Sequence, residues 1–308
     1  MGVGHGHGHQ GGAATGGHAG ARHRWRLGVS FGLIAAFFVV ELVVGLTSGS
    51  LALISDAGHM AADVVTLGAA LVATKIATRE DSTGRRTYGS YRAEVFASGL
   101  AVLMMLGVAV YVVIEAIGRI GGEPDVRTGP MLVVGLLGLV INVVAMVLLR
   151  AGAQDSLNVK GAYVEVIADT AGSVGVMVAG ALILATGNGV WDTVVAFLIG
   201  GFVAVRAVML GREVLAVLGQ HVPAGLEIDT VTGALAELDG VRDVHDLHAW
   251  TLTSGMNVAT AHLVLVEGAD GGSVLRAGQL LLRERFAIEH ATLQIEGHRS
   301  AACDAVSW

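Results

Sequence analysis

Six long apolar stretches dominate the first two thirds of the chain, and shorter elements of mixed periodicity follow them. The stretches cover residues 27–47, 51–77, 93–117, 130–150, 161–185 and 190–210. Each is close to the ~20 residues that a helix needs to cross the hydrocarbon core of a bilayer. The pattern therefore predicts an all-α membrane domain of six spanning helices.

Beyond Arg212 the hydrophobic pattern changes to short elements. It predicts helices over 230–238 and 273–286 and strands over 244–252, 257–266 and 291–296. The order helix–strand–strand–helix–strand indicates a small α+β layer similar to ferredoxin-like metal-chaperone domains. Because so small a core is only marginally stable alone, we expect this domain to dimerise.

Composition supports a membrane protein with one modest soluble domain. Of the 308 residues, 53% are hydrophobic and 15% charged, and the net charge of -7 argues against nucleic-acid binding. The N-terminal stretch is rich in glycine and histidine and is predicted to be disordered, with metal collection as its alternative role. We therefore divide the chain into a disordered tail (1–26), a six-span domain (27–210), a cytoplasmic domain (211–298) and a C-terminal tail (299–308).

The distribution of basic residues predicts the orientation in the membrane. They cluster before the first span, between spans two and three, between spans four and five, and after span six. The positive-inside rule then places both termini in the cytoplasm, and the short loops suggest a bacterial inner membrane. Arg206 is expected near the inner end of span six, where its head group can reach the surface.

Two pairs of potential metal ligands lie inside the predicted spans. His59 and Asp63 are four residues apart in the second, and Glu165 and Asp169 have the same spacing in the fifth, so each pair shares a helix face. A charged group at the bilayer centre costs at least a few kcal/mol and is by default functional. We expect no cationic partner in these spans, so the four residues predict a tetrahedral transition-metal site and a role in transport.

At these residues the sequence resembles the cation diffusion facilitator family, especially its zinc-transporting branch. The similarity extends over about residues 27–297 and is carried by Ser50–Asp63, Arg92–Glu94, Asn158–Gly175, Val244–Gly255 and Ala261–Val264. It implies a homodimeric exporter with six helices per protomer, which moves a divalent metal out of the cytoplasm in exchange for protons. It also implies a transport site at the positions of His59, Asp63, Glu165 and Asp169.

Glu165 departs from the family pattern, because the zinc branch usually has histidine there. With all three carboxylates ionised, the empty site carries a charge of -3, and Glu165 is expected to exchange protons as metal binds and leaves. A third carboxylate also makes the site harder and favours Mn²⁺, Co²⁺ or Fe²⁺. We still expect Zn²⁺, with Cd²⁺ and Co²⁺ as further substrates, and an exporter of Mn²⁺, Co²⁺ or Fe²⁺ as the alternative; no bound cofactor is expected.

The resemblance also implies a cytoplasmic metal site that includes His245 and His262. The family adds residues of the last strand, which here are Gln294, a poor zinc ligand, and Glu296. His248 lies three residues after His245, so strict strand alternation predicts that the two histidines face opposite ways. We therefore expect a site of His245, His262 and Glu296 without His248, with a structural or simply exposed role for these histidines as the alternative.

Two other classes of protein are alternatives to a transporter. An intramembrane metalloenzyme would need a motif such as His-Glu-x-x-His, and the chain has none. We therefore expect no enzymatic activity. A metal sensor would bind ions without moving them, but two ligand pairs within the membrane exceed what sensing requires.

Overall fold

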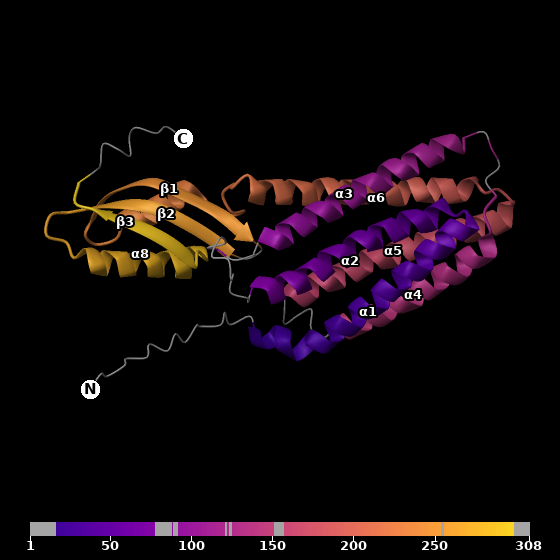
Figure 1. The fold of residues 1–308 in the computed structure, drawn as a ribbon, viewed down its shortest axis with the longest axis horizontal. Helices are drawn as coiled ribbons and strands as arrows, with labels where there is room; N and C mark the ends of the chain where they lie inside the picture. Colours follow the sequence, from indigo (N-terminus) through magenta and orange to yellow (C-terminus); the bar gives the residue numbers. More distant parts are fainter. Residues whose placement is uncertain are drawn as a thin grey trace. The chain divides into compact units, whose positions relative to one another are not determined.

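The computed structural model describes residues 17–77, 88, 92–120, 122, 125–150, 157–253 and 256–298. This part of the chain forms six long helices and a small α+β domain (Figure 1). The helices are α1 (Gly17–Ser48), α2 (Leu51–Ala77), α3 (Arg92–Gly118), α4 (Thr128–Arg150), α5 (Leu157–Thr186) and α6 (Val190–Leu218). Only the helical backbone is described for residues 17–28, 30, 66–77, 157–162 and 164.

Five of the long helices are apolar and long enough to cross a membrane. The qualifying segments are Phe31–Ser48, Arg92–Gly118, Thr128–Arg150, Glu165–Thr186 and Val190–Leu218. The sixth, α2, carries His59 and Asp63 and has its side chains described to Val65. The helical membrane domain predicted from the sequence is thus confirmed.

The helices extend further than the apolar stretches that predict them. Helix α1 begins at Gly17, within the His-rich stretch predicted to be disordered, and residues 1–16 lie outside the described residues. Helix α6 continues to Leu218 instead of ending at residue 210. Alanine, leucine and arginine are good helix formers, so a helix can continue past the apolar segment.

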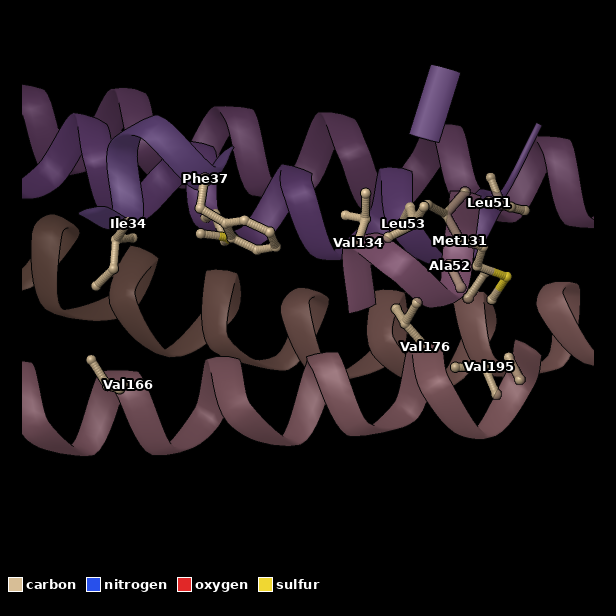
Figure 2. Close-up of a cluster of buried hydrophobic side chains, with 14 of the residues drawn as sticks. Ile34, Phe37, Leu51, Ala52, Leu53, Met131, Val134, Val166, Val176 and Val195 are labelled. Carbon is tan, nitrogen blue, oxygen red and sulfur yellow. The ribbon is translucent and has the colours of Figure 1, made fainter. Parts of the chain in front are cut away.

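All six long helices contribute to a buried apolar cluster, part of which is drawn in Figure 2. It includes Ile34, Phe37, Leu51, Leu53, Met131, Val134, Val176 and Val195. Gly138 on α4 allows a close approach, because a Cβ there would lie 2.6 Å from Phe37 Cζ and 2.9 Å from Ser173 Oγ. Such small residues let helices pack closely in lipid, where packing contacts drive association.

A buried carboxylate at the start of α6 fixes the start of α2. Asp192 accepts hydrogen bonds from the Ser50 hydroxyl at 2.6 Å and from the backbone N–H groups of Leu51 and Ala52 at 2.6 and 3.2 Å. The first N–H groups of a helix lack partners within the helix, so Asp192 satisfies donors that would otherwise be unpaired. Arg119 Nη1 lies 3.3 Å from the same carboxylate and balances its charge.

The C-terminal domain has the predicted element order. It comprises α7 (Ile228–Ala236), β1 (Val241–Thr253), β2 (Met256–Leu265), α8 (Gly271–Phe286) and β3 (His290–Glu296). The sheet order is β1-β2-β3, with β1 antiparallel and β3 parallel to the central β2. A parallel pair needs a crossover connection, and α8 provides it (Figure 1).

Alternation along β2 separates a hydrophobic face from a polar one. Ala259, Ala261, Leu263 and Leu265 point into a core that α7 and α8 complete with Val231, Leu235, Val274 and Leu282. The intervening residues, including Thr260 and His262, therefore project from the opposite face of the sheet. That face carries the candidate ligands of the soluble domain.

Candidate metal centres

Helices α2 and α5 bring their two ligand pairs together. His59 and Asp63 lie one helical turn apart on α2, and Glu165 and Asp169 have the same spacing on α5. His59 Nε2 is 3.6 Å from Asp63 Oδ2 and 3.6 Å from Asp169 Oδ1. The residues that the sequence predicted on two separate spans therefore converge on one imidazole nitrogen.

Three of the four predicted ligands have the spacing of a metal site. One donor atom each from His59, Asp63 and Asp169 lies within 4.8 Å of the other two. Ligands of tetrahedral zinc, with bonds of about 2.0–2.1 Å, lie about 3.3–3.4 Å apart, and the two 3.6 Å distances from His59 Nε2 are close to that spacing. The His59 and Asp169 side chains are 3% exposed. Among the described residues, Asp63 Oδ2 and Asp169 Oδ1 accept no hydrogen bond.

Glu165, the fourth predicted ligand, is paired with an arginine. Its Oε1 lies 3.9 Å from His59 Nε2 and forms an ion pair with Arg206 of α6. Arg206 Nη1 is also 2.9 Å from His59 Nε2. The expectation that no cation lies near these carboxylates is therefore wrong, because the cation comes from a third helix, α6, and not from the two helices that carry the ligands.

Further polar side chains are buried near this centre. Glu41 on α1, Asp56 on α2 and Asn142 on α4 are each at most 2% exposed. Asn142 Nδ2 donates a hydrogen bond of 3.4 Å to Ser173 Oγ on α5. The Asp56 carboxylate lies where a Cβ on Gly172 of α5 would be, so a glycine at 172 makes room for it. The ligand helices are thus surrounded by polar groups as well as by the apolar cluster.

The soluble domain gathers a second set of ligands on the polar face of its sheet. His245 on β1 lies directly opposite His262 on β2, with ring centroids 5.2 Å apart. Glu296 on β3 reaches both rings, at 3.5 Å from His245 Nε2 and 3.1 Å from His262 Nδ1. Gln294 donates a 2.6 Å hydrogen bond to Glu296 Oε1, so it orients this carboxylate. The predicted trio is therefore close enough to share an ion.

An irregularity in β1 adds two residues to this cluster. Asp246 has a φ of 52°, and the register with β2 shifts between His245 and His248. A bulge inserts one extra residue, so His248 returns to the face of His245, and the prediction of opposite faces is wrong. Asp246 lies 3.0 Å from His248 Nε2 and 3.7 Å from His262 Nε2.

Sequence reasoning missed Arg206 and Asp246 as members of these centres. An arginine within an apolar helix is a signal, since intramembrane charges usually have buried partners. Asp246 gives a weaker signal, because aspartate tolerates the left-handed backbone of some bulges better than most residues. Neither signal identifies the partner, which depends on how neighbouring elements are placed.

Comparisons with known proteins cover almost the whole described chain. Residues 27–218 match the family model described as the cation efflux transmembrane domain. Residues 223–298 match the model described as the cation efflux protein cytoplasmic domain.

Individual relatives match along nearly their full length. The metal cation efflux system protein CzcD of Cupriavidus metallidurans is 40% identical over 298 residues, which is 96% of this chain and 90% of that protein. The cadmium, cobalt and zinc/H(+)-K(+) antiporter of Bacillus velezensis is 32% identical over 91% of this chain and 90% of its own. Zinc transporter ZitB of Escherichia coli is 33% identical over 88% and 87%, respectively.

Among solved structures, the metal-bound C-terminal domain of the CzcD transporter from Cupriavidus metallidurans is 30% identical. That match covers 23% of this chain and 99% of the domain, with a TM-score of 0.22.

Proposed function

This chain belongs to the cation efflux family, and we propose that it exports Zn²⁺ from the cytoplasm in exchange for protons. Relatives that this chain matches along most of their length are named as a metal cation efflux system protein, a zinc transporter and a cadmium, cobalt and zinc antiporter. The observation that carries the proposal is the buried convergence of His59, Asp63 and Asp169 between two membrane helices.

The charge of this centre explains how metal and protons are exchanged. Asp63 and Asp169 lie together in a low-dielectric environment, where uncompensated negative charge is costly. A divalent ion bound to both compensates that charge, and protons compensate it when the ion has left. Since a metal ligand must be deprotonated, metal and protons bind in alternation. If the site opens to one side of the membrane at a time, this alternation couples the two fluxes.

The donor set favours a borderline transition metal as substrate. One imidazole and two carboxylates suit tetrahedral Zn²⁺, and the same set accepts Co²⁺ and Cd²⁺. Direct coordination by Glu165 would add a hard oxygen and favour Mn²⁺ or Fe²⁺. An exporter of Mn²⁺ or Fe²⁺ is therefore the alternative that transport assays must address.

Proton flux in proteoliposomes tests this function. The purified protein is reconstituted with a pH-sensitive dye inside, and Zn²⁺, Cd²⁺, Co²⁺, Mn²⁺ and Fe²⁺ are added in turn. We expect Zn²⁺ to drive proton movement, and Asp169→Asn to reduce it at least about a hundredfold by removing a charged ligand. Asp229→Asn, at an exposed position on α7, is the matched control. Proton movement driven by Zn²⁺ at equal rates in both variants would refute the assignment of the site.

The soluble domain is proposed to bind a second ion and to hold two protomers together. His245, His262 and Glu296 supply three ligands, and the domain matches the family's cytoplasmic-domain model. With this domain in the cytoplasm, both termini lie on the side from which metal is loaded. Such a centre would sense cytoplasmic metal without being on the transport path.

The number of Zn²⁺ ions bound per protomer tests whether this second centre binds metal. In the full-length protein carrying Asp169→Asn, we expect one Zn²⁺ per protomer to remain after dialysis against micromolar Zn²⁺. Adding His262→Ala should remove that ion, whereas adding His221→Ala, at an exposed histidine, should not. Retention of the ion in the His262→Ala protein would place it elsewhere.

A further inference from the structure

Arg206 places a permanent positive charge inside the proposed transport site. Its Nη1 atom is 2.9 Å from His59 Nε2, it forms an ion pair with Glu165, and its guanidinium lies 6.0 Å from the centroid of the Phe202 ring. The Arg206 and Glu165 side chains are 29% and 26% exposed, whereas His59 is almost fully buried. The arginine therefore enters the centre from its more open edge.

The chemistry of the guanidinium fixes the direction of its contact with His59. Arginine carries only hydrogen-bond donors and stays protonated in proteins, so His59 Nε2 must be the acceptor. The lone pair that would bind an ion is thus already occupied by Arg206. The same group holds Glu165 Oε1, and Glu165 is not in the trio of closely spaced ligands.

We propose that Arg206 is a resident cation of the transport site that fills the empty centre and determines which ions bind. An arriving divalent ion displaces Arg206 from His59 and binds to His59, Asp63 and Asp169. Arg206 remains paired with Glu165 and keeps this carboxylate out of the coordination shell. This inference rests on the proposed function and makes Arg206 a specificity-determining residue.

Charge and ligand type give the inference two measurable consequences. Glu165, Asp63 and Asp169 carry -3 when ionised, and Arg206 reduces the total to -2. Without the arginine, a divalent ion should bind more tightly, by at least about tenfold for a unit charge only a few Å away. Freed Glu165 could then coordinate the ion, and a further carboxylate shifts preference toward Mn²⁺.

The test measures Zn²⁺ and Mn²⁺ affinity of the full-length protein by equilibrium dialysis, with His262→Ala present throughout to remove the cytoplasmic centre. Arg206→Gln is compared with Arg212→Gln, which removes an exposed charge from the same helix. We expect Arg206→Gln to lower the Kd for Zn²⁺ about tenfold and the Kd for Mn²⁺ about a hundredfold. Arg212→Gln should leave both within about twofold of the parent.

Glu165→Gln, alone and combined with Arg206→Gln, gives a double-mutant cycle. It also keeps the proposal testable if the Arg206→Gln protein does not fold. Alone, it leaves Arg206 unpaired beside His59, so both metals should bind about tenfold more weakly. Combined with Arg206→Gln, it should abolish the gain in Mn²⁺ preference. Affinities of Arg206→Gln and Glu165→Gln that match Arg212→Gln would overturn the inference, as would weaker binding in Arg206→Gln.

The Asp169→Asn protein separates the two proposals. If it loses metal while Arg206→Gln behaves like Arg212→Gln, the transport site stands and the role of Arg206 is refuted. If the parent protein binds no metal at this site, both proposals fail.

Discussion

Asp192→Ala should destabilise the membrane domain more than most single substitutions. The wild-type carboxylate is fully buried and accepts three hydrogen bonds at the start of α2. Truncation leaves the N–H groups of Leu51 and Ala52 without this acceptor. It also leaves Arg119 without its buried partner. The substitution therefore removes a helix cap and one half of an ion pair together.

The expected cost follows from these contacts. Removing one partner of a buried ion pair typically costs about 3–5 kcal/mol, and hydrogen bonds to a charged group contribute about 1.5–3 kcal/mol each without being additive. We expect a loss of about 3–5 kcal/mol for Asp192→Ala. Asp192→Asn keeps one acceptor oxygen and should cost about half as much.

Thermal unfolding in detergent, followed by tryptophan fluorescence, measures the effect, since Trp191 is the preceding residue. A change of 1 kcal/mol shifts the melting temperature of a domain of this size by about 2–4 °C, so Asp192→Ala should lower it by about 6–20 °C. Glu115→Gln is the matched control, because it removes the more exposed partner of Arg119, at 3.4 Å. Exposed pairs contribute at most about 1 kcal/mol.

A melting temperature for Asp192→Ala within the range of Glu115→Gln would refute this reasoning. It would mean that the start of α2 is held by the surrounding apolar cluster alone.

Two other substitutions test the packing of the helices and the cap of α8. Gly138→Ala inserts a methyl group against Phe37 and should cost about 1–3 kcal/mol in the same melting assay, whereas Gly201→Ala, with open space around it, should be neutral or stabilising. The pKa of Asp270 is lowered by two hydrogen bonds that its carboxylate accepts. The Ser273 hydroxyl has the larger effect, and the backbone N–H of Gly272 comes second. The stabilisation of α8 by the ionised Asp270 carboxylate is therefore complete above the ordinary pKa of aspartate. It is lost as the pH falls through the lowered pKa of Asp270. Amide exchange in α8 should be faster in Asp270→Ala than in wild type at pH 6, and the difference should shrink as the pH falls through the lowered pKa of Asp270.

Local sequence patterns predicted most of the fold. The length of the apolar stretches was sufficient to predict the membrane helices, and the two-residue alternation was sufficient to predict the strands. Each of these properties depends only on neighbouring residues along one element. Element ends were less predictable, as α6 shows, because helix formers beyond the membrane segment let it continue.

Spacing within one element predicted the ligand pairs of the membrane site, and the resemblance to a family predicted which elements meet. His59 with Asp63 and Glu165 with Asp169 follow from four-residue spacing. The contact of Arg206 with Glu165 depends on the rotation of α6 about its own axis, which a nearly uniform apolar helix does not encode. Its hydrophobic residues surround the helix, so no stripe distinguishes the face toward the site.

The bulge at Asp246 has a consequence for how the soluble domain can change by insertion and deletion. Val244 and Leu247 both pack against the domain core although they are three positions apart, because the extra residue reverses the alternation. Deleting Asp246 would leave β1 and β2 paired residue for residue, so Val244 and Leu247 would still face the core and His245 and His248 would still share the ligand face. What would be lost is the Asp246 carboxylate, which lies 3.0 Å from His248 Nε2 and 3.7 Å from His262 Nε2. This codon can therefore be lost or gained without exchanging the faces of the strand, and each such event removes or adds one acidic group at the ligand cluster.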